Sequence, residues 1–478
     1  MENLNNLTIV KARKLLESGE ITSVELVTDC LNQIEKTKEL NALISVDKEI
    51  AISEAKKADE RIKMGEKLPL LGVPIIVKDN ISTLDYKTTC ASKFLSNYVA
   101  PYEATVVKKL KDAGAVIIGK ANMDEFAMGA SGETSYFGKT LNPIDTSRVP
   151  GGSSSGSAVA VASNQCMASL GTDTGGSIRQ PAGFCGVVGM KPTYGRVSRY
   201  GVVAFASSLD QVGPITKTVE DNAIMLEVLG GVDEFDKTSC NETIDFVSGL
   251  NKPIKGLKIG VAKEYFELKL DPTIRKEIEN VIEFYRANGA EIVNISLPNI
   301  SKSLAVYYIL SSAEASSNLS RFDGIKYGVR AEDYSGLIDL YYKSRSEGFG
   351  DEVKRRIMIG NYVLSAGYYD AYYKKANDVR EKLKQEFRAC FAKCDAIISP
   401  VSPTTAFKFG EKKSPLDMYL SDIYTVPVNI VGVPAISLPV AKDENGMPIA
   451  CQLIADNFNE KVLYTLADFY EKMKGGKF

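Results

Sequence analysis

Histidine is absent from the 478 residues of this chain. Its absence excludes every catalytic triad that uses an imidazole base, and it excludes zinc sites that need histidine ligands. Long apolar runs are also lacking, because no stretch approaches the roughly 20 apolar residues that span a bilayer. The charged segment from Met1 to Lys14 has no long apolar core, so it does not resemble a signal peptide. We therefore expect a soluble, cytoplasmic protein without membrane association.

The chain has few cysteines, and its basic and acidic residues nearly balance. The eight cysteines are scattered, and the close pair Cys390 and Cys394 has no second pair with which to complete a zinc site. We predict reduced, mostly buried thiols and no metal site, because disulfide frameworks belong to small secreted domains. The 58 basic and 60 acidic residues give a formal net charge of −2. A nucleic-acid surface over the whole chain is therefore not expected.

Helical and strand-like patterns alternate along the chain, as is typical of α/β proteins. The first 65 residues have helical spacing, and Thr22 and Glu25 resemble the two ends of a capping box. Short β-branched runs at 73–77 and 115–118 flank a helical segment at 103–114, which predicts two buried strands. Further strand-like runs lie at 258–261, 292–293, 396–398 and 435–438, and long helical patterns cover 272–288 and 348–393.

These patterns predict one domain over residues 1–478, built on a largely parallel or mixed sheet. A helical segment would occupy about 1–65, a core with the Gly/Ser-rich segments 66–230, and the remaining core 256–478. The polar, turn-rich stretch 231–255 is expected to be an exposed connection, and a surface subdomain is expected within 300–390.

Two Gly/Ser clusters lie close together in the first half of the chain. Residues 151–157 read GGSSSGS, and residues 171–181 read GTDTGGSIRQP. The glycines before Ser177 permit the dihedral angles that a nest of inward-pointing N–H groups requires. Such a nest can serve as an oxyanion hole beside a serine nucleophile. A flexible loop or a phosphate cradle has the same composition, so the cluster alone leaves these alternatives open.

A serine nucleophile needs an adjacent base, and lysine, aspartate, glutamate and tyrosine are the candidates in a chain without histidine. Lys78 follows the apolar run 73–77, which places it at the end of a predicted buried strand. Active-site groups commonly lie at such strand ends. Burial would favour the neutral amine, because desolvation disfavours the charged form. A solvated lysine at a strand end is the alternative interpretation.

Lys78, Ser153 and Ser177, each within its local context, resemble the amidase signature family. The segments that carry the resemblance are 72–79, 150–154, 171–181, 185–189 and 191–196. One departure is Ser155, where many members of the family have glycine. The resemblance covers nearly the whole chain. It implies the amidase signature fold, an α/β fold in which helices cover both faces of a large mixed β-sheet.

The same resemblance implies a Ser–cis-Ser–Lys triad. Ser177 would form the acyl-enzyme, Ser153 would relay the proton after a cis peptide bond, and neutral Lys78 would accept it. Asp173 and Arg179 would brace the loop. The oxyanion would be held by four consecutive N–H groups, those of Thr174, Gly175, Gly176 and Ser177.

The second half of the chain more narrowly resembles the A subunits of bacterial glutamyl-tRNA(Gln) amidotransferases, in the segments 313–328, 348–357 and 367–373. Free glutamine carries a carboxylate and an ammonium, so its pocket needs one cation and one anion. Arg356 matches the family's carboxylate-binding position, and Asp422 matches its ammonium-binding position. A tyrosine, Tyr307 or Tyr308, would line the same pocket, and the sequence leaves open which.

This resemblance implies a glutaminase that supplies ammonia to B and C subunits in a heterotrimer. The chain itself would bind no cofactor, whereas ATP and magnesium would act in the partner subunit that amidates Glu-tRNA(Gln). The tRNA would be held mainly by the B subunit, which agrees with the mild acidity of this chain. Whether Asp-tRNA(Asn) is also a substrate stays open.

Three other functions compete with this one. A stand-alone amidase for small aliphatic or aryl amides would share the triad but lack a pair of opposite charges such as Arg356 and Asp422. A binding or scaffolding protein could retain the fold without activity. A nucleotide-binding protein could use the Gly/Ser loops as phosphate cradles, but the chain has no complete phosphate-binding motif.

Overall fold

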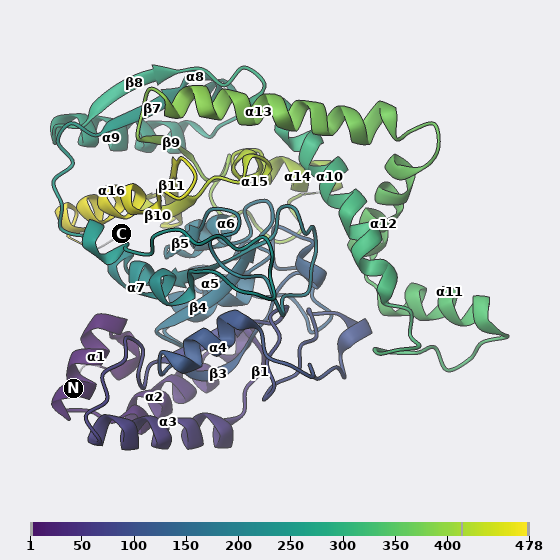
Figure 1. Cartoon of the computed structure of the whole chain (residues 1–478), viewed down its shortest axis with the longest axis horizontal. Coiled ribbons are helices and arrows are strands. Elements are labelled where there is room, and N and C mark those ends of the chain that lie inside the picture. The colour runs from purple at the N-terminus through teal and green to yellow at the C-terminus, as the bar shows by residue number, and fades with distance from the viewer. Residues whose placement is uncertain (1–2, 413, 476–478) are drawn as a thin grey trace.

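In the computed structural model, which describes residues 3–412 and 414–475, one mixed sheet runs through the whole molecule (Figure 1). Its eleven strands follow the order β1-β3-β2-β4-β6-β5-β10-β11-β9-β7-β8. The strands are β1 (Leu43–Ser45), β2 (Pro74–Lys78), β3 (Val116–Ala121), β4 (Ala168–Asp173), β5 (Val188–Lys191), β6 (Gln211–Thr216), β7 (Lys258–Ala262), β8 (Glu291–Ile295), β9 (Ala396–Pro400), β10 (Ala435–Lys442) and β11 (Pro448–Ala455).

Parallel pairs lie on the two flanks of the sheet and antiparallel pairs form its centre, and the edge strand β1 pairs antiparallel with β3. On one flank β2 lies parallel to both β3 and β4, and on the other β7 lies parallel to β8 and β9. The central strands β4, β6, β5, β10, β11 and β9 pair antiparallel. Every residue of β2, β3, β4 and β9 is buried, which is why these strands have no polar–apolar alternation.

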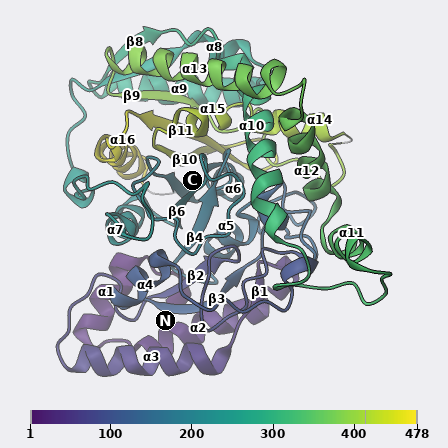
Figure 2. The same cartoon turned by 45° about the vertical axis from the view of Figure 1, so that its right-hand side comes forward.

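Helices cover both faces of the sheet. The α-helices are α1 (Ile9–Ser18), α2 (Ser23–Lys36), α3 (Lys48–Lys63), α4 (Thr105–Asp112), α5 (Ser155–Ala162), α6 (Arg179–Cys185), α7 (Val219–Leu229), α8 (Lys263–Glu267), α9 (Pro272–Ala287), α10 (Ser303–Asn318), α11 (Leu337–Gly348), α12 (Asp351–Leu364), α13 (Lys375–Phe391), α14 (Pro415–Tyr419), α15 (Val426–Val431) and α16 (Glu460–Met473). Figure 2 shows α5 and α6 on one side of the central strands and α7 and α16 on the other. The predicted α/β fold with a mixed sheet is confirmed.

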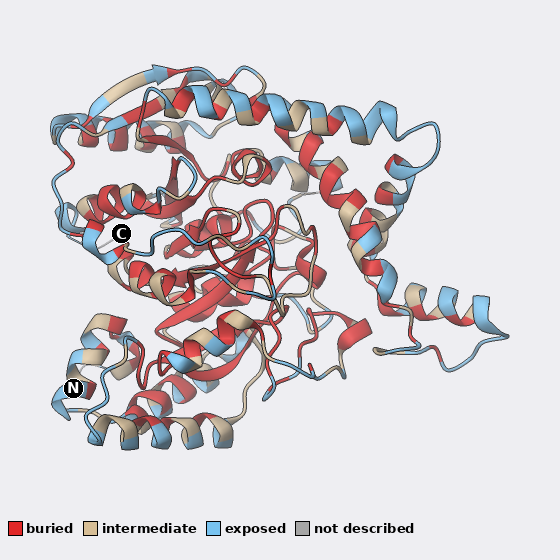
Figure 3. Cartoon of the chain, viewed as in Figure 1, coloured by how far each residue is buried: buried red, intermediate tan, exposed pale blue. Residues whose placement is uncertain are grey.

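Helices α10 to α13 form a layer outside the sheet, where α11 projects from the body of the molecule (Figure 3). One face of α10 is buried against α12, α13 and α15, whereas the outer faces of α11 and α13 are exposed. This layer includes Arg356 on α12 and both candidate tyrosines on α10. It therefore supplies one wall of the candidate site described below.

Most of the predicted elements are present, including the capping box at Thr22 and Glu25. Three expectations are wrong in part. The first 65 residues also contain a strand, β1, because Leu43–Ser45 pairs with the edge of β3. The helical pattern at 348–393 is interrupted between α12 and α13, where Gly367 has φ +88°. The stretch 231–255 is only partly exposed, because Phe246, Leu250 and Ile254 are buried in the main core.

Two further expectations concern the burial of the cysteines and the absence of a membrane-spanning helix. None of the eight cysteines forms a disulfide, and all are buried except Cys240, which is half-buried. The prediction of mostly buried thiols is therefore confirmed. Over residues 3–412 and 414–475, no helix has both the length and the apolar character needed to cross a bilayer.

Candidate active site

The carboxyl ends of two parallel strands place Lys78 beside the second Gly/Ser cluster. Lys78 is the last residue of β2, and Thr172 and Asp173 end the neighbouring strand β4. The register pairs Val77 with Leu170, so the residues that follow meet at the same edge of the sheet. Parallel pairing thus joins positions that are almost one hundred residues apart in the sequence.

The Lys78 amine is fully buried and surrounded by hydroxyl groups. Its Nζ lies 2.8 Å from Ser153 Oγ, 2.9 Å from Ser154 Oγ and 2.9 Å from Thr172 Oγ1. Burial lowers the pKa of Lys78 to about 7, even though the carboxylates of Asp124 and Asp173 favour the charged form. A large fraction of the amine is therefore neutral at physiological pH.

The neighbouring hydroxyls determine where the lone pair of a neutral Lys78 points. Ser154 Oγ donates to the carbonyl of Thr172 at 3.1 Å, and Thr172 Oγ1 accepts a hydrogen bond from Asn80 Nδ2 at 3.1 Å. Both oxygens can then accept the two N–H bonds of a neutral amine. In that arrangement the lone pair is left for Ser153, whose hydroxyl can donate to it.

Ser153 follows a cis peptide bond from Gly152, as the family resemblance implied. The preceding glycines allow a close approach to two buried side chains. A Cβ atom at Gly152 would lie 2.0 Å from Asp124 Oδ2, and one at Gly151 would lie 2.5 Å from Gln180 Oε1. Gln180 Oε1 also accepts a hydrogen bond from the N–H of Gly152 at 2.9 Å. Any larger residue at 151 or 152 would displace the loop that presents Ser153.

Residues 174–178, here called the nucleophile loop because they contain the predicted nucleophile Ser177, lie directly against the first cluster. The backbone N–H of Ser154 donates to the carbonyl of Ser177 at 3.1 Å. Ser177 itself is buried apart from 7% of its surface. The structure thus brings Lys78, Ser153 and Ser177 into one region, although they come from three separate segments of the chain.

The four predicted oxyanion donors do not have the same surroundings. The N–H of Gly176 donates to Asp173 Oδ1 at 2.8 Å, and the N–H of Ile178 donates to Asp173 Oδ2 at 3.1 Å. Within the described part of the chain, the N–H groups of Thr174, Gly175 and Ser177 have no acceptor. In this conformation the N–H groups of Thr174, Gly175 and Ser177 can donate to an oxyanion. The N–H of Gly176 instead fixes the loop to Asp173.

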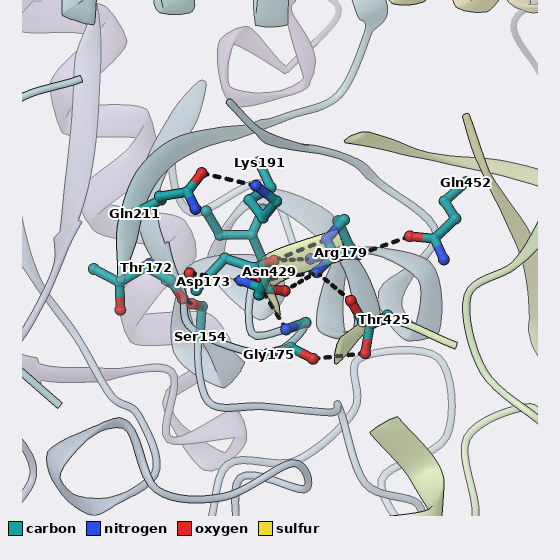
Figure 4. A network of polar contacts seen from close by, with 12 residues as sticks. Ser154, Thr172, Asp173, Gly175, Arg179, Lys191, Gln211, Thr425, Asn429 and Gln452 are labelled. Atoms are coloured by element: carbon teal, nitrogen blue, oxygen red, sulfur yellow. Dashed lines mark hydrogen bonds and ion pairs between the residues drawn. The ribbon is translucent and has the colours of Figure 1, made fainter. Parts of the chain in front are cut away.

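An ion pair beneath the loop holds it in place (Figure 4). Asp173 and Arg179 are both fully buried, with the Nε of Arg179 3.1 Å from Asp173 Oδ2. Burial by itself would raise the pKa of Asp173, but Arg179 lowers it to about 2. Arg179 also donates to Gln452 Oε1 at 2.7 Å and to Asn429 Oδ1 at 2.6 Å. The expectation that Asp173 and Arg179 brace the loop agrees with these contacts.

A cavity of about 340 Å³ opens beside the loop 129–134, which also contacts Gly152 and Gln180. Three of the four residues predicted to bind glutamine line it: Tyr308, Arg356 and Asp422. The fourth, Tyr307, packs against the nucleophile loop, so that a Cβ atom at Gly175 would lie 2.5 Å from Tyr307 Cζ. The structure therefore places Tyr308 on the cavity wall and Tyr307 against the candidate oxyanion loop.

Arg356 is buried in the cavity wall and has one unused group of donors. Its Nε donates to Glu352 Oε1 at 2.7 Å, and its guanidinium lies 4.4 Å from the Tyr308 ring and 4.9 Å from the Tyr419 ring. The buried Nη1 has no hydrogen-bond partner within the described residues. A buried N–H group without an acceptor is unfavourable, so the Nη1 group is suited to an anionic ligand.

Asp422 supplies the opposite charge in the same cavity. Its Oδ2 accepts a hydrogen bond from Tyr308 Oη at 2.9 Å. Burial raises the pKa of Asp422 to about 7, although Tyr308 and Arg356 favour the carboxylate. A cationic ligand group would stabilise the ionised form.

Several other residues in the cavity wall were not predicted from the sequence. Glu352 and Tyr419 help to hold Arg356 in place. Tyr419 Oη donates to Glu352 Oε1 at 2.9 Å, and the Tyr419 ring stacks on the Tyr308 ring with a centroid separation of 3.9 Å. The loop 129–134 forms another part of the wall. The i, i+4 spacing of Glu352 and Arg356 on a helix was the only available signal.

Comparison with known proteins identifies the family. A model of the family described as amidase matches residues 25–464. The chain belongs to the amidase family. This membership confirms the family predicted from Lys78, Ser153 and Ser177, and it identifies the chain as an enzyme of that family.

Among relatives of this amidase, the A subunit of glutamyl-tRNA(Gln) amidotransferase from Caldanaerobacter subterraneus subsp. tengcongensis is 54% identical over 472 residues, covering 98% of this chain and 96% of its own. The crystal structure of the protein with the same name from Thermotoga maritima has a TM-score of 0.82 and 43% identity, over 98% of this chain and 96% of that chain. The native peptide amidase of Stenotrophomonas maltophilia has a TM-score of 0.83 but 28% identity, over 98% and 97%. Because the TM-scores are nearly equal, the shared fold alone does not identify the amide substrate.

Proposed function

We propose that this amidase hydrolyses glutamine as the A subunit of a glutamyl-tRNA(Gln) amidotransferase. The observation that carries the proposal is the cavity beside the loop 129–134, which has the buried Arg356 and the half-buried Asp422 in its wall. Glutamine presents one carboxylate and one ammonium, and the amide at the end of its side chain is the group to be hydrolysed. The 54% identity with a protein named as that subunit supports the same assignment.

In the proposed reaction, Ser177 Oγ attacks the side-chain amide carbon of glutamine. Its proton passes to Ser153 Oγ as the proton of Ser153 passes to the Lys78 amine. The developing oxyanion is stabilised by N–H groups of the loop 174–177. The relay then runs backwards to protonate the amide nitrogen, so that ammonia leaves and the γ-glutamyl group remains on Ser177. Water then hydrolyses this ester and releases glutamate.

The two charges in the cavity wall would orient the substrate. The guanidinium of Arg356 would bind the α-carboxylate through the Nη1 group that has no partner among the described residues. Asp422 and the hydroxyl of Tyr308 would bind the α-ammonium. In a stand-alone amidase for uncharged amides, the substrate would offer no carboxylate to the buried Nη1 group of Arg356, which would stay without an acceptor.

The ammonia would be used by other subunits. We propose a heterotrimer in which a B subunit binds Glu-tRNA(Gln) and a C subunit contacts this chain. ATP and magnesium would act in the partner subunit, and this chain would hold neither. The formal net charge of −2 supports this division, since tRNA binding requires a positive surface.

Ammonia release by the purified chain tests the proposal. We expect glutamine-dependent ammonia that increases when the B and C subunits are added, and little release from an uncharged amide such as propionamide. The opposite result, in which propionamide is cleaved and glutamine is inert with and without the partners, would establish a stand-alone amidase.

Arg356→Gln tests the proposed carboxylate contact. We expect the KM for glutamine to rise by about 100-fold while kcat changes little, because a charge-assisted pair of hydrogen bonds to the ground-state substrate is lost. Steady-state kinetics across a wide range of glutamine concentrations gives both constants. Lys354→Gln, on the same helix but exposed, should leave KM unchanged. An Arg356→Gln enzyme with unaltered KM would place the carboxylate elsewhere.

A further inference from the structure

The peptide unit between Gly175 and Gly176 is held from both sides. Its carbonyl oxygen, on Gly175, accepts a hydrogen bond from Thr425 Oγ1 at 2.7 Å. Its N–H, on Gly176, donates to Asp173 Oδ1 at 2.8 Å. Figure 4 shows Thr425 and Asp173 on either side of this part of the loop. Thr425 is fully buried, so no solvent competes for its hydroxyl.

This peptide unit lies between two of the candidate oxyanion donors. The N–H of Gly175 precedes it and the N–H of Ser177 follows it. Two consecutive glycines permit rotation of the peptide plane that other residues would resist, and Gly176 already has φ +134°. The two bonds fix this unit in place, and with it the Cα atoms of Gly175 and Gly176. A displaced unit would shift both Cα atoms, and therefore the adjoining peptide units that carry the N–H groups of Gly175 and Ser177.

Thr425 also joins the nucleophile loop to the residue proposed to bind the ammonium of glutamine. The Thr425 N–H donates to the carbonyl of Asp422 at 3.0 Å, so both residues belong to one turn before α15. The Thr425 hydroxyl lies 3.1 Å from the same carbonyl, but its single proton favours Gly175 at the shorter distance. The carbonyl of Thr425 accepts from Arg179 Nη2 at 3.1 Å, which ties this turn to the ion pair beneath the loop.

We propose that Thr425 is a positioning residue for glutamine hydrolysis, whose hydroxyl anchors the Gly175–Gly176 peptide and so keeps the adjoining N–H groups of the candidate oxyanion hole in place. The inference rests on the proposed function. It assigns different roles to Thr425 and Asp422. Asp422 contacts the substrate and so affects KM, whereas Thr425 stabilises the transition state and so affects kcat.

Two variants that differ in the hydroxyl test this proposal. Thr425→Val keeps the shape of threonine without the hydroxyl, and Thr425→Ser keeps the hydroxyl without the methyl group. We expect Thr425→Val to lower kcat by about 30-fold, somewhat less than the roughly 100-fold or greater loss of an oxyanion donor itself, with KM for glutamine within about twofold. Thr425→Ser should restore kcat to within about threefold of the parent enzyme. If valine prevents folding, judged by thermal unfolding, Thr425→Ala is compared with Thr425→Ser.

Three outcomes would overturn the proposal: an unchanged kcat in Thr425→Val, an equal loss of kcat in both hydroxyl-containing and hydroxyl-free variants, or a loss confined to KM. The last would mean that Thr425 acts through Asp422. The same variants are measured with any uncharged amide that the parent enzyme cleaves. Failure of the parent enzyme on glutamine would refute the proposed function, but the kcat comparison on that amide would still test Thr425.

Discussion

Ser177→Ala is expected to lower glutamine hydrolysis by roughly 10⁵-fold or more, with the folded structure intact. The residue has the position of the nucleophile, and the loss of a nucleophile removes covalent catalysis altogether. Its backbone carbonyl accepts from Ser154, and that bond does not depend on the side chain. The variant should therefore bind glutamine with near-normal affinity. Ammonia release and the thermal unfolding midpoint are the two measurements.

A buried serine outside the site provides the control for this substitution. Ser163→Ala removes a hydroxyl that donates to the carbonyl of Val159 at the end of α5, and activity should persist. Mass spectrometry of the parent enzyme during turnover should find a γ-glutamyl adduct on the peptide containing Ser177. An adduct on another residue, or a Ser177→Ala enzyme that retains a tenth of the activity, would rule out this nucleophile.

Lys78→Met should reduce kcat by about 10⁴-fold, because methionine has a similar length but cannot accept the proton from Ser153. Methionine also suits a fully buried position, since it is apolar and flexible. The KM for glutamine should change little, because Lys78 is not among the residues that line the cavity with Arg356 and Asp422. Kinetics of Lys78→Arg, which keeps a permanent positive charge, should show an equally low kcat.

The pH dependence of kcat follows from the same lysine. Only the neutral amine accepts a proton, and burial lowers the pKa of Lys78 to about 7. The kcat should therefore fall about tenfold per pH unit below pH 6 and reach a plateau above pH 8. Saturating glutamine is needed throughout, because protonation of Asp422 weakens binding over the same range. A kcat that continues to rise beyond pH 9 would mean that Lys78 retains its ordinary pKa.

Part of the fold was predictable because several elements carry their own signal. Strands such as β2 and β9 are buried on both faces and consist of apolar β-branched runs. Strands β4 and β6 were not predicted, because glycine, proline and polar residues interrupt their sequences. These two strands are stabilised by pairing with each other and with buried neighbours. Their positions depend on contacts that local patterns do not encode.

By itself, the sequence determined the α/β fold class, the family and the three residues proposed as the triad. Glycine-rich loops, buried strands and the lack of histidine are features of composition or of short segments. They can therefore be identified in a single sequence. Tertiary structure decided the surroundings of these groups. Tyr308 rather than Tyr307 lines the cavity, the N–H of Gly176 is held by Asp173, and Thr425 lies against a loop some 250 residues away. Such contacts depend on how the sheet and its helices pack, because packing brings together residues that share no local pattern.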